Sequence, residues 1–241
     1  MVSRTISNQT TVAPTTREAA HGAVATAASN RWALWGVPAA VLGFAGLMVT
    51  PDYAGLETTG AGVIEQLDRG GYHLGIVLGI AAALCMLITA AGWQRWGARV
   101  APDSLAARLV PMAFAASAAL MMLGYGFMGS LAVYLPGGMD DGTFPTEGLY
   151  SVFMFLDFAP YIAWWGAAFA AIGIAWLSLR ERSLPIWIGV VSALFALIPI
   201  AFMSITGLPG FPGVVDPLWL LIVSAGMALR RNTGARPAID D

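Results

Sequence analysis

Six long apolar segments, separated by loops whose charge alternates in sign, constrain this chain more than any other feature of its sequence. Each segment is close to or longer than the ~20 residues that a helix needs to cross a bilayer. We therefore predict an all-α fold, a polytopic transmembrane bundle of six helices. The predicted spans cover residues 32–50, 71–93, 108–135, 149–178, 185–205 and 214–230.

The composition agrees with this fold class. The chain has 241 residues, of which 58% are hydrophobic and 11% are charged. A soluble domain normally carries about 25% charged residues, so the deficit is too large for a surface that faces water. We therefore expect the lipid bilayer to be the main partner of the surface, and we expect no nucleic-acid partner.

The distribution of arginine predicts the orientation of the chain. All twelve basic residues are arginine, and eleven of them fall on one predicted side: Arg4, Arg17, Arg31, Arg95, Arg99, Arg108, Arg180, Arg182, Arg230, Arg231 and Arg236. The other side carries Arg69 and the acidic residues Asp52, Glu57, Glu65, Asp68, Asp140, Asp141, Glu147 and Asp216. Because cytoplasmic loops carry the excess of basic residues, both termini are predicted to be cytoplasmic, in the inner (plasma) membrane of a bacterial cell.

The chain divides into three predicted regions. Residues 1–30 are rich in Ser, Thr and Ala and are predicted to form a disordered cytoplasmic tail, because they cannot bury enough apolar surface to offset their ordering entropy. Residues 31–231 form the six-helix transmembrane domain, and residues 232–241 form a C-terminal cytoplasmic tail.

Asp157 is the first candidate for function, as a carboxylate inside the fourth predicted span. Counted from Tyr150 it lies ~10 Å deep, where an ionisable group is expensive unless it faces the bundle interior or water. Pro160 should interrupt the helix near it, and Tyr161 and either Trp164 or Trp165 continue roughly the same face. One interpretation is a ligand-binding polar pocket open to the outside. The other is a structural Asp bonded to a neighbouring span.

A second candidate cluster precedes the second span. Glu65, Arg69 and His73 share one face if that helix begins early, because their spacing is four residues. In the functional interpretation Arg69 binds an anionic group and His73 or Asp157 moves a proton. An interfacial salt bridge with a helix cap is the favoured interpretation, because exposed ion pairs are common and contribute little.

The sequence contains few residues that could bind a metal or a cofactor. There are only two histidines, and His21 lies in the predicted tail, whereas a zinc site needs three or four close ligands. The absence of lysine excludes a Schiff base on that residue type. The segment from Gly124 to Gly129 matches G-x-G-x-x-G, but a dinucleotide site needs a preceding strand, so we interpret these glycines as packing or bending positions. We therefore expect no metal and no cofactor.

Part of the chain resembles uncharacterised bacterial six-span integral membrane proteins grouped as a domain of unknown function. The likeness lies in a basic loop followed by Leu184-Pro185-Ile186-Trp187-Ile188-Gly189, a Gly/Pro-rich turn, Pro217-Leu218-Trp219-Leu220 and a terminal Arg230-Arg231. The resemblance implies the six-span architecture. That family has no assigned reaction or ligand, so the resemblance carries over no functional residue.

Three hypotheses of function follow. The leading one is a non-enzymatic bundle that binds a small-molecule or lipid ligand, or supports a partner protein. The second is a small secondary transporter or proton-coupled permease that uses Asp157, and it predicts a polar path toward Thr89 or Ser117. The third is a membrane-embedded enzyme with Asp157, His73 and Arg69 around one pocket. The sequence leaves the oligomeric state open.

Overall fold

The computed structural model describes residues 30–49 and 60–229, and within these residues it is helical with no strands. The short helix η1 (Asn30–Trp35) leads into α2 (Gly36–Met48), and η3 (Gly60–Gln66) precedes the remaining helices. These are α3 (Arg69–Val100), α4 (Leu105–Tyr134), α5 (Thr146–Leu156), α6 (Ala159–Ile162), α7 (Trp165–Leu179), α8 (Ile186–Thr206) and α9 (Phe211–Leu229). Of the predicted tails, residues 1–29 and 232–241 lie outside the described residues, and Asn30 belongs to η1.

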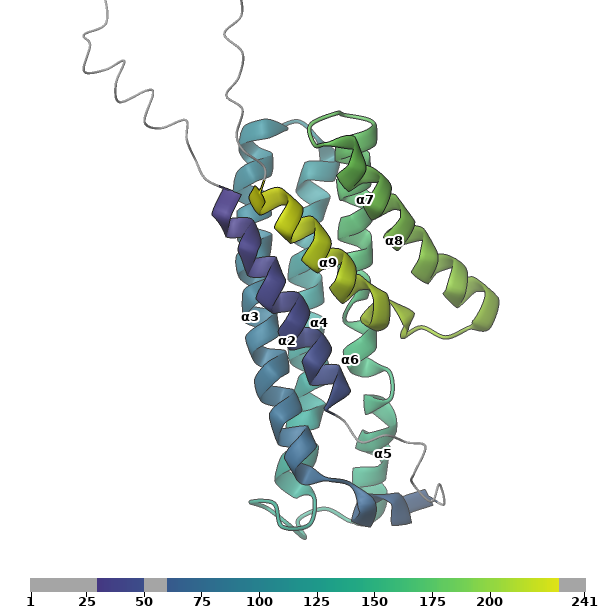
Figure 1. Cartoon of the computed structure of the whole chain (residues 1–241). Helices are drawn as coiled ribbons and strands as arrows, with labels where there is room; N and C mark the ends of the chain where they lie inside the picture. The colour runs from purple at the N-terminus through teal and green to yellow at the C-terminus, as the bar shows by residue number, and fades with distance from the viewer. Residues whose placement is uncertain (1–29, 50–59, 230–241) are drawn as a thin grey trace, which may run out of the picture. The chain divides into compact units, whose positions relative to one another are not determined.

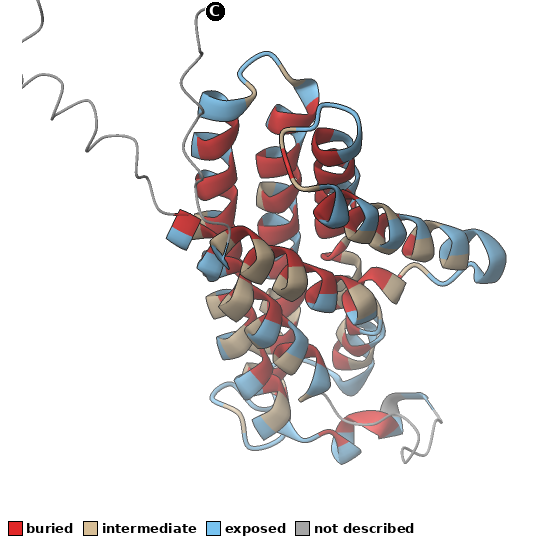
Figure 2. Cartoon of the chain, turned by 45° about the horizontal axis from the view of Figure 1, so that its top comes forward, coloured by how far each residue is buried: buried red, intermediate tan, exposed pale blue. Residues whose placement is uncertain are grey.

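The prediction of six spans is confirmed. Six helices in the described ranges are long and apolar enough to cross a membrane: Asn30–Met48, Arg69–Val100, Leu105–Tyr134, Thr146–Leu179, Ile186–Thr206 and Phe211–Leu229. They are consistent with a multi-pass membrane protein. Large apolar side chains on their outward faces are exposed, for example Leu84 at 59%, Leu123 at 58% and Leu197 at 64%. Figure 2 shows the same division, with buried positions turned toward the bundle and exposed positions turned outward.

Local sequence signals set several of the helix ends. The Asp68 side chain accepts hydrogen bonds from the backbone N–H groups of Gly70 and Gly71, so it caps the N-terminus of α3. The Ser104 side chain caps α4 by accepting from the Ala107 N–H. The α8 helix ends at Gly207, whose φ of 75° suits glycine.

The fourth span is not one continuous helix. It consists of α5, the single turn α6 and α7, which are interrupted at residues 157–158 and again at residues 163–164. Pro160 lies in α6 directly after the first interruption, which confirms the predicted break near this proline. A Cβ on Gly124 of α4 would lie 3.0 Å from the Pro160 Cα, so this glycine allows α4 to approach α6 closely.

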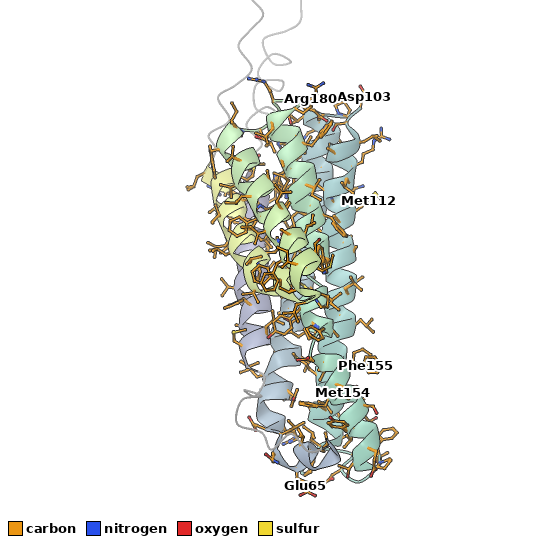
Figure 3. All side chains as sticks on the ribbon, turned by 90° about the vertical axis from the view of Figure 1, so that its right-hand side faces the viewer. Glu65, Asp103, Met112, Met154, Phe155 and Arg180 are labelled. Carbon is orange, nitrogen blue, oxygen red and sulfur yellow. The ribbon has the colours of Figure 1, made fainter. Side chains whose placement is uncertain are left out.

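Charged residues separate toward the two ends of the bundle. The α3–α4 and α7–α8 connections, with Arg95, Arg99, Arg108, Arg180 and Arg182 in or near them, lie at one end, here called the arginine end (Figure 1). The opposite end carries η3 and the α4–α5 connection and is called the acidic end; Figure 3 labels Arg180 at the former and Glu65 at the latter. The arrangement matches the predicted segregation of these charges, while the side of the membrane that each end faces stays a prediction.

The helices reach different levels along the bundle. The α8–α9 turn contains Gly210, where a Cβ would lie 3.1 Å from the Phe158 ring and 3.2 Å from the Tyr161 Cβ. This turn is therefore level with the interruption of the fourth span. The acidic-end parts of α3, α4 and α5 extend well past it (Figure 1). A residue next to Phe158 thus lies at the level of the α8–α9 turn, beyond which α2, α3, α4 and α5 continue toward the acidic end.

Candidate functional site

Asp157 is exposed, so the prediction that its side chain faces the bundle interior is wrong. The residue lies in the interruption between α5 and α6, beside Phe158, and thus at the level of the α8–α9 turn. Because α5 is one helix from Thr146 to Leu156, Asp157 does lie about 10 Å from Tyr150 along it, but Tyr150 itself lies beyond the α8–α9 turn, toward the acidic end. Asp157 is close enough to Tyr161 to interact with it electrostatically.

We expect Asp157→Asn and Asp157→Leu to leave the stability of the protein within about 0.5 kcal/mol of the wild type, because the exposed Asp157 carboxylate forms no hydrogen bond or ion pair with the described residues and substitutions at such positions have small effects. Thermal unfolding of the purified variants in detergent measures this. A loss of several kcal/mol in both variants would show instead that the carboxylate holds the interruption together.

The residues of the second candidate cluster are also exposed. Glu65, Arg69 and His73 all present exposed side chains. Glu65 belongs to η3, whereas α3 begins at Arg69, so the early helix start that would align all three is not present. Asp68 forms the helix cap of the favoured interpretation. Among the described residues, no hydrogen bond or ion pair links Arg69 or His73 to Asp157. The three residues of the enzyme hypothesis are therefore not connected to one another by such contacts.

Asp216 is a fully buried carboxylate of the bundle. The charge pattern groups it with the acidic residues of the predicted outer side, although the predicted sixth span, residues 214–230, already includes it. The α9 helix begins at Phe211, and Asp216 lies in its second turn with no exposed surface. Both of its carboxylate oxygens are buried and have no hydrogen-bond partner. An intramembrane carboxylate therefore exists, but it is Asp216 rather than Asp157.

The packing of α9 against α6 places Asp216 beside the second interruption of the fourth span. A Cβ on Gly213 would lie 2.8 Å from the Tyr161 Cα, so α9 and α6 touch at these two residues. From this contact, α9 and the fourth span both run toward the arginine end (Figure 1). Three residues further along α9 is Asp216, and three residues further along the fourth span is Trp164. The two residues are therefore at the same level.

The packing of α2 against α9 leads to the same level independently. A Cβ on Gly36 would lie 2.9 Å from the Ser224 Cβ and 3.3 Å from the Leu220 Cδ1, and the two helices run in opposite directions (Figure 1). Gly43 lies seven residues, or about 10 Å, further along α2, and the same count back along α9 from Leu220 or Ser224 leads to Gly213 or Pro217, the two positions on either side of Asp216. At Gly43 a Cβ would lie 2.6 Å from the Trp164 ring. Counted along the helices, Asp216 thus lies near the level at which Gly43 of α2 contacts Trp164.

Trp164 carries the second buried polar group near this level. The residue is fully buried, and its indole Nε1–H has no hydrogen-bond partner. Two nearby tryptophans differ from it: Trp165 Nε1 donates to the Pro209 carbonyl at 2.9 Å, and Trp219 Nε1 donates to the Ser192 hydroxyl at 3.1 Å. A buried indole N–H normally finds a partner, and elsewhere Trp32 also lacks one among the described residues.

The other polar side chains nearby satisfy the backbone. Ser117 of α4 donates to the Ala163 carbonyl, which the second interruption releases from helical bonding. Thr89 donates to the Cys85 carbonyl of its own helix at 2.9 Å. The polar path toward Thr89 or Ser117 that a transporter using Asp157 would need is therefore not supported. No group of three or more His, Cys, Asp or Glu residues within 30–49 and 60–229 is placed to hold a metal ion.

The candidate site is thus the layer of Asp216 and Trp164, which we call the Asp216 layer. The sequence predicted Trp164 as a ligand-binding residue but missed Asp216. A signal was present, because Asp216 is a single acidic residue among apolar ones and Pro212 suits the first turn of a helix. Comparison with known proteins adds no relative: no family model, no curated protein and no solved structure matches the chain.

Proposed function

We propose that this protein is a non-enzymatic multi-pass membrane protein that binds a small hydrogen-bonding cation in the Asp216 layer of its helix bundle. The observation that carries the proposal is the Asp216 carboxyl group, whose two oxygens are fully buried and unpartnered. Ionisable residues inside membrane segments are expensive, and they commonly line ligand or ion sites.

The energetic argument concerns what Asp216 requires. A buried polar group without a partner costs about 1–3 kcal/mol, and more if it is charged. The carboxyl group is therefore stable as the protonated acid, or as the anion when a bound molecule supplies donors. A small cation with N–H groups offers both the charge and the donors that an ionised carboxylate needs.

The surroundings of Asp216 restrict the ligand. The Trp164 indole, counted along the helices, lies near the level of Asp216, its N–H has no hydrogen-bond partner, and its ring offers an aromatic face. An aromatic face attracts a cation by ~0.5–2 kcal/mol, depending on desolvation. Glycine at position 43 leaves room only for the edge of the Trp164 ring, so the layer is closely packed there. These features favour a compact cation over an elongated substrate.

A thermal-shift experiment tests this proposal. The purified protein in detergent is titrated with ammonium, methylammonium and guanidinium chloride, and sodium chloride serves as the ionic-strength control. At least one of the three cations is expected to raise the melting temperature, because a ligand at 100 times its dissociation constant adds about 2.7 kcal/mol of stability.

Matched variants locate the effect. Asp216→Asn removes the ionisable group with little change of shape, and it is expected to abolish the shift, while Trp164→Phe should weaken it. Asp157→Asn removes the same charge from an exposed position and should retain the full shift. The proposal fails if none of the three cations stabilises the wild type, or if Asp216→Asn responds as the wild type does.

A second candidate function is proton-coupled transport through Asp216. The observation that favours it is the discontinuous fourth span beside the buried carboxyl group, because transporters commonly place binding sites at interrupted helices. Proteoliposomes with an internal pH-sensitive dye would distinguish the two functions. Transport requires a proton flux in the wild type that Asp216→Asn abolishes, whereas simple binding shows none.

A further inference from the structure

Outside the Asp216 layer, a groove lies between α3 and α4 at the arginine end. Its volume is about 710 Å³. Small side chains make the groove, because α3 and α4 pack closely there: a Cβ on Gly97 would lie 3.1 Å from the Ala107 carbonyl oxygen. The polar side chains along it are Gln94 and Arg108, and no acidic residue lines it.

The length of the groove matches half of a bilayer. On α3 it extends from Leu87 to Ala98, a rise of about 17 Å, whereas half of the hydrocarbon core measures ~15 Å. The far end of the groove is apolar, and its polar end lies at the α3–α4 connection. An acyl chain could thus lie along the whole groove with its headgroup at the arginine end.

Arg108 is held at the polar end of this groove. It is exposed, and its Nη2 donates to the Pro102 carbonyl at 3.2 Å, which leaves further N–H donors of the guanidinium free for a ligand. Arg99 and Arg95 follow on α3 at the same end, and both side chains are exposed. Planar guanidinium groups suit phosphate oxygens, and basic pockets between spans bind anionic headgroups.

A neighbouring groove provides an internal comparison. It lies on the other side of α4, between α4 and α7, and Arg108 and Met112 line both grooves; Figure 3 labels Met112 toward the arginine end. This second groove also contains Asp103 and Glu181. Two carboxylates beside one arginine repel an anion, so an anionic ligand belongs in the α3–α4 groove.

We propose that the α3–α4 groove binds one anionic membrane phospholipid, with its phosphate at Arg108 and one acyl chain along the small-residue groove. Lipid tails are as apolar as the groove, so the chain contributes fit rather than driving force. Selectivity comes from the headgroup. A basic residue near an anionic headgroup favours it on the order of fivefold.

Native mass spectrometry of the full chain in detergent tests this proposal. The protein is titrated with phosphatidylglycerol or with phosphatidylcholine of identical acyl chains, and the first bound lipid is quantified. The wild type is expected to prefer phosphatidylglycerol by at least about fivefold, and Arg108→Gln should reduce this preference toward unity.

Two further variants separate the groove from general charge. Arg182→Gln removes an exposed arginine from the α7–α8 connection at the same end and should leave the preference unchanged. Ala98→Leu keeps every charge but fills the groove, and it should lower binding of the first phosphatidylglycerol. If Arg108→Gln and Arg182→Gln weaken the preference equally, or if Ala98→Leu has no effect, the groove is not the site.

Discussion

Replacing Gly166 by alanine is expected to destabilise the protein by about 1–3 kcal/mol, the usual cost of forcing extra volume into a packed interior. Gly166 lies in the first turn of α7, and an added Cβ would clash with the Ala113 carbonyl oxygen and lie 2.7 Å from the Ser117 backbone nitrogen. Both are backbone atoms of α4, so no side-chain rotation relieves the clash. Thermal or chemical unfolding in detergent measures the loss.

The control for this prediction is Gly126→Ala on α4. A Cβ at Gly126 meets nothing within 4 Å, and alanine is favoured over glycine in a helix by ~1 kcal/mol. The two substitutions are chemically identical and should therefore have opposite signs. Equal effects would mean that α4 and α7 do not approach each other as closely as described.

Replacing Asp216 by leucine is expected to raise the stability of the ligand-free protein by about 1–3 kcal/mol, because it removes a buried polar group that has no partner. Leucine repeats the branching of the aspartate side chain, and buried charged groups exchanged for apolar ones of similar shape are often neutral or stabilising. Unfolding of wild type and variant without added ligand provides the measurement.

Asp216→Asn distinguishes the cause of this gain. Asparagine keeps the shape but still buries polar atoms, so its stability should stay close to that of the wild type. If Asp216→Leu is less stable than Asp216→Asn, the Asp216 side chain makes polar interactions in the protein. A stable but cation-insensitive Asp216→Leu protein would instead separate the stability of the fold from ligand binding.

Most of the fold could be predicted because hydropathy reports span length directly. The six spans follow from continuous apolar runs. Asp68 indicates the start of α3, and Pro160 indicates the interruption of the fourth span. Helix ends near glycine and proline were harder. Residues 206–217 contain turn-forming residues throughout, yet the turn lies before Phe211 because Pro212 fits a helical first turn and Pro217 is tolerated inside α9.

The site depended on tertiary packing and was largely hidden from the sequence. The depth of a residue was counted along its own helix, which ignores that α5 extends past the α8–α9 turn. Asp157 and Asp216 consequently exchanged roles, the first exposed and the second buried. Trp164 was predicted as a ligand-binding residue on roughly the same face as Asp157, whereas the structure buries Trp164 and exposes Asp157. The packing of Trp164 depends on which neighbours α2 and α4 supply.

The unequal reach of the helices has a consequence for the surrounding bilayer. The α4 helix carries no charged residue between Arg108 and its end at Tyr134, a stretch of 26 residues and about 39 Å, whereas α9 has 19 residues and a length of about 29 Å. A bilayer whose hydrocarbon core of ~30 Å matches α9 is too thin for the uncharged length of α4. Hydrophobic mismatch therefore differs around the circumference of this one protein. Lipids next to α4 must stretch, or this helix must tilt, where the same bilayer fits α9 without adjustment.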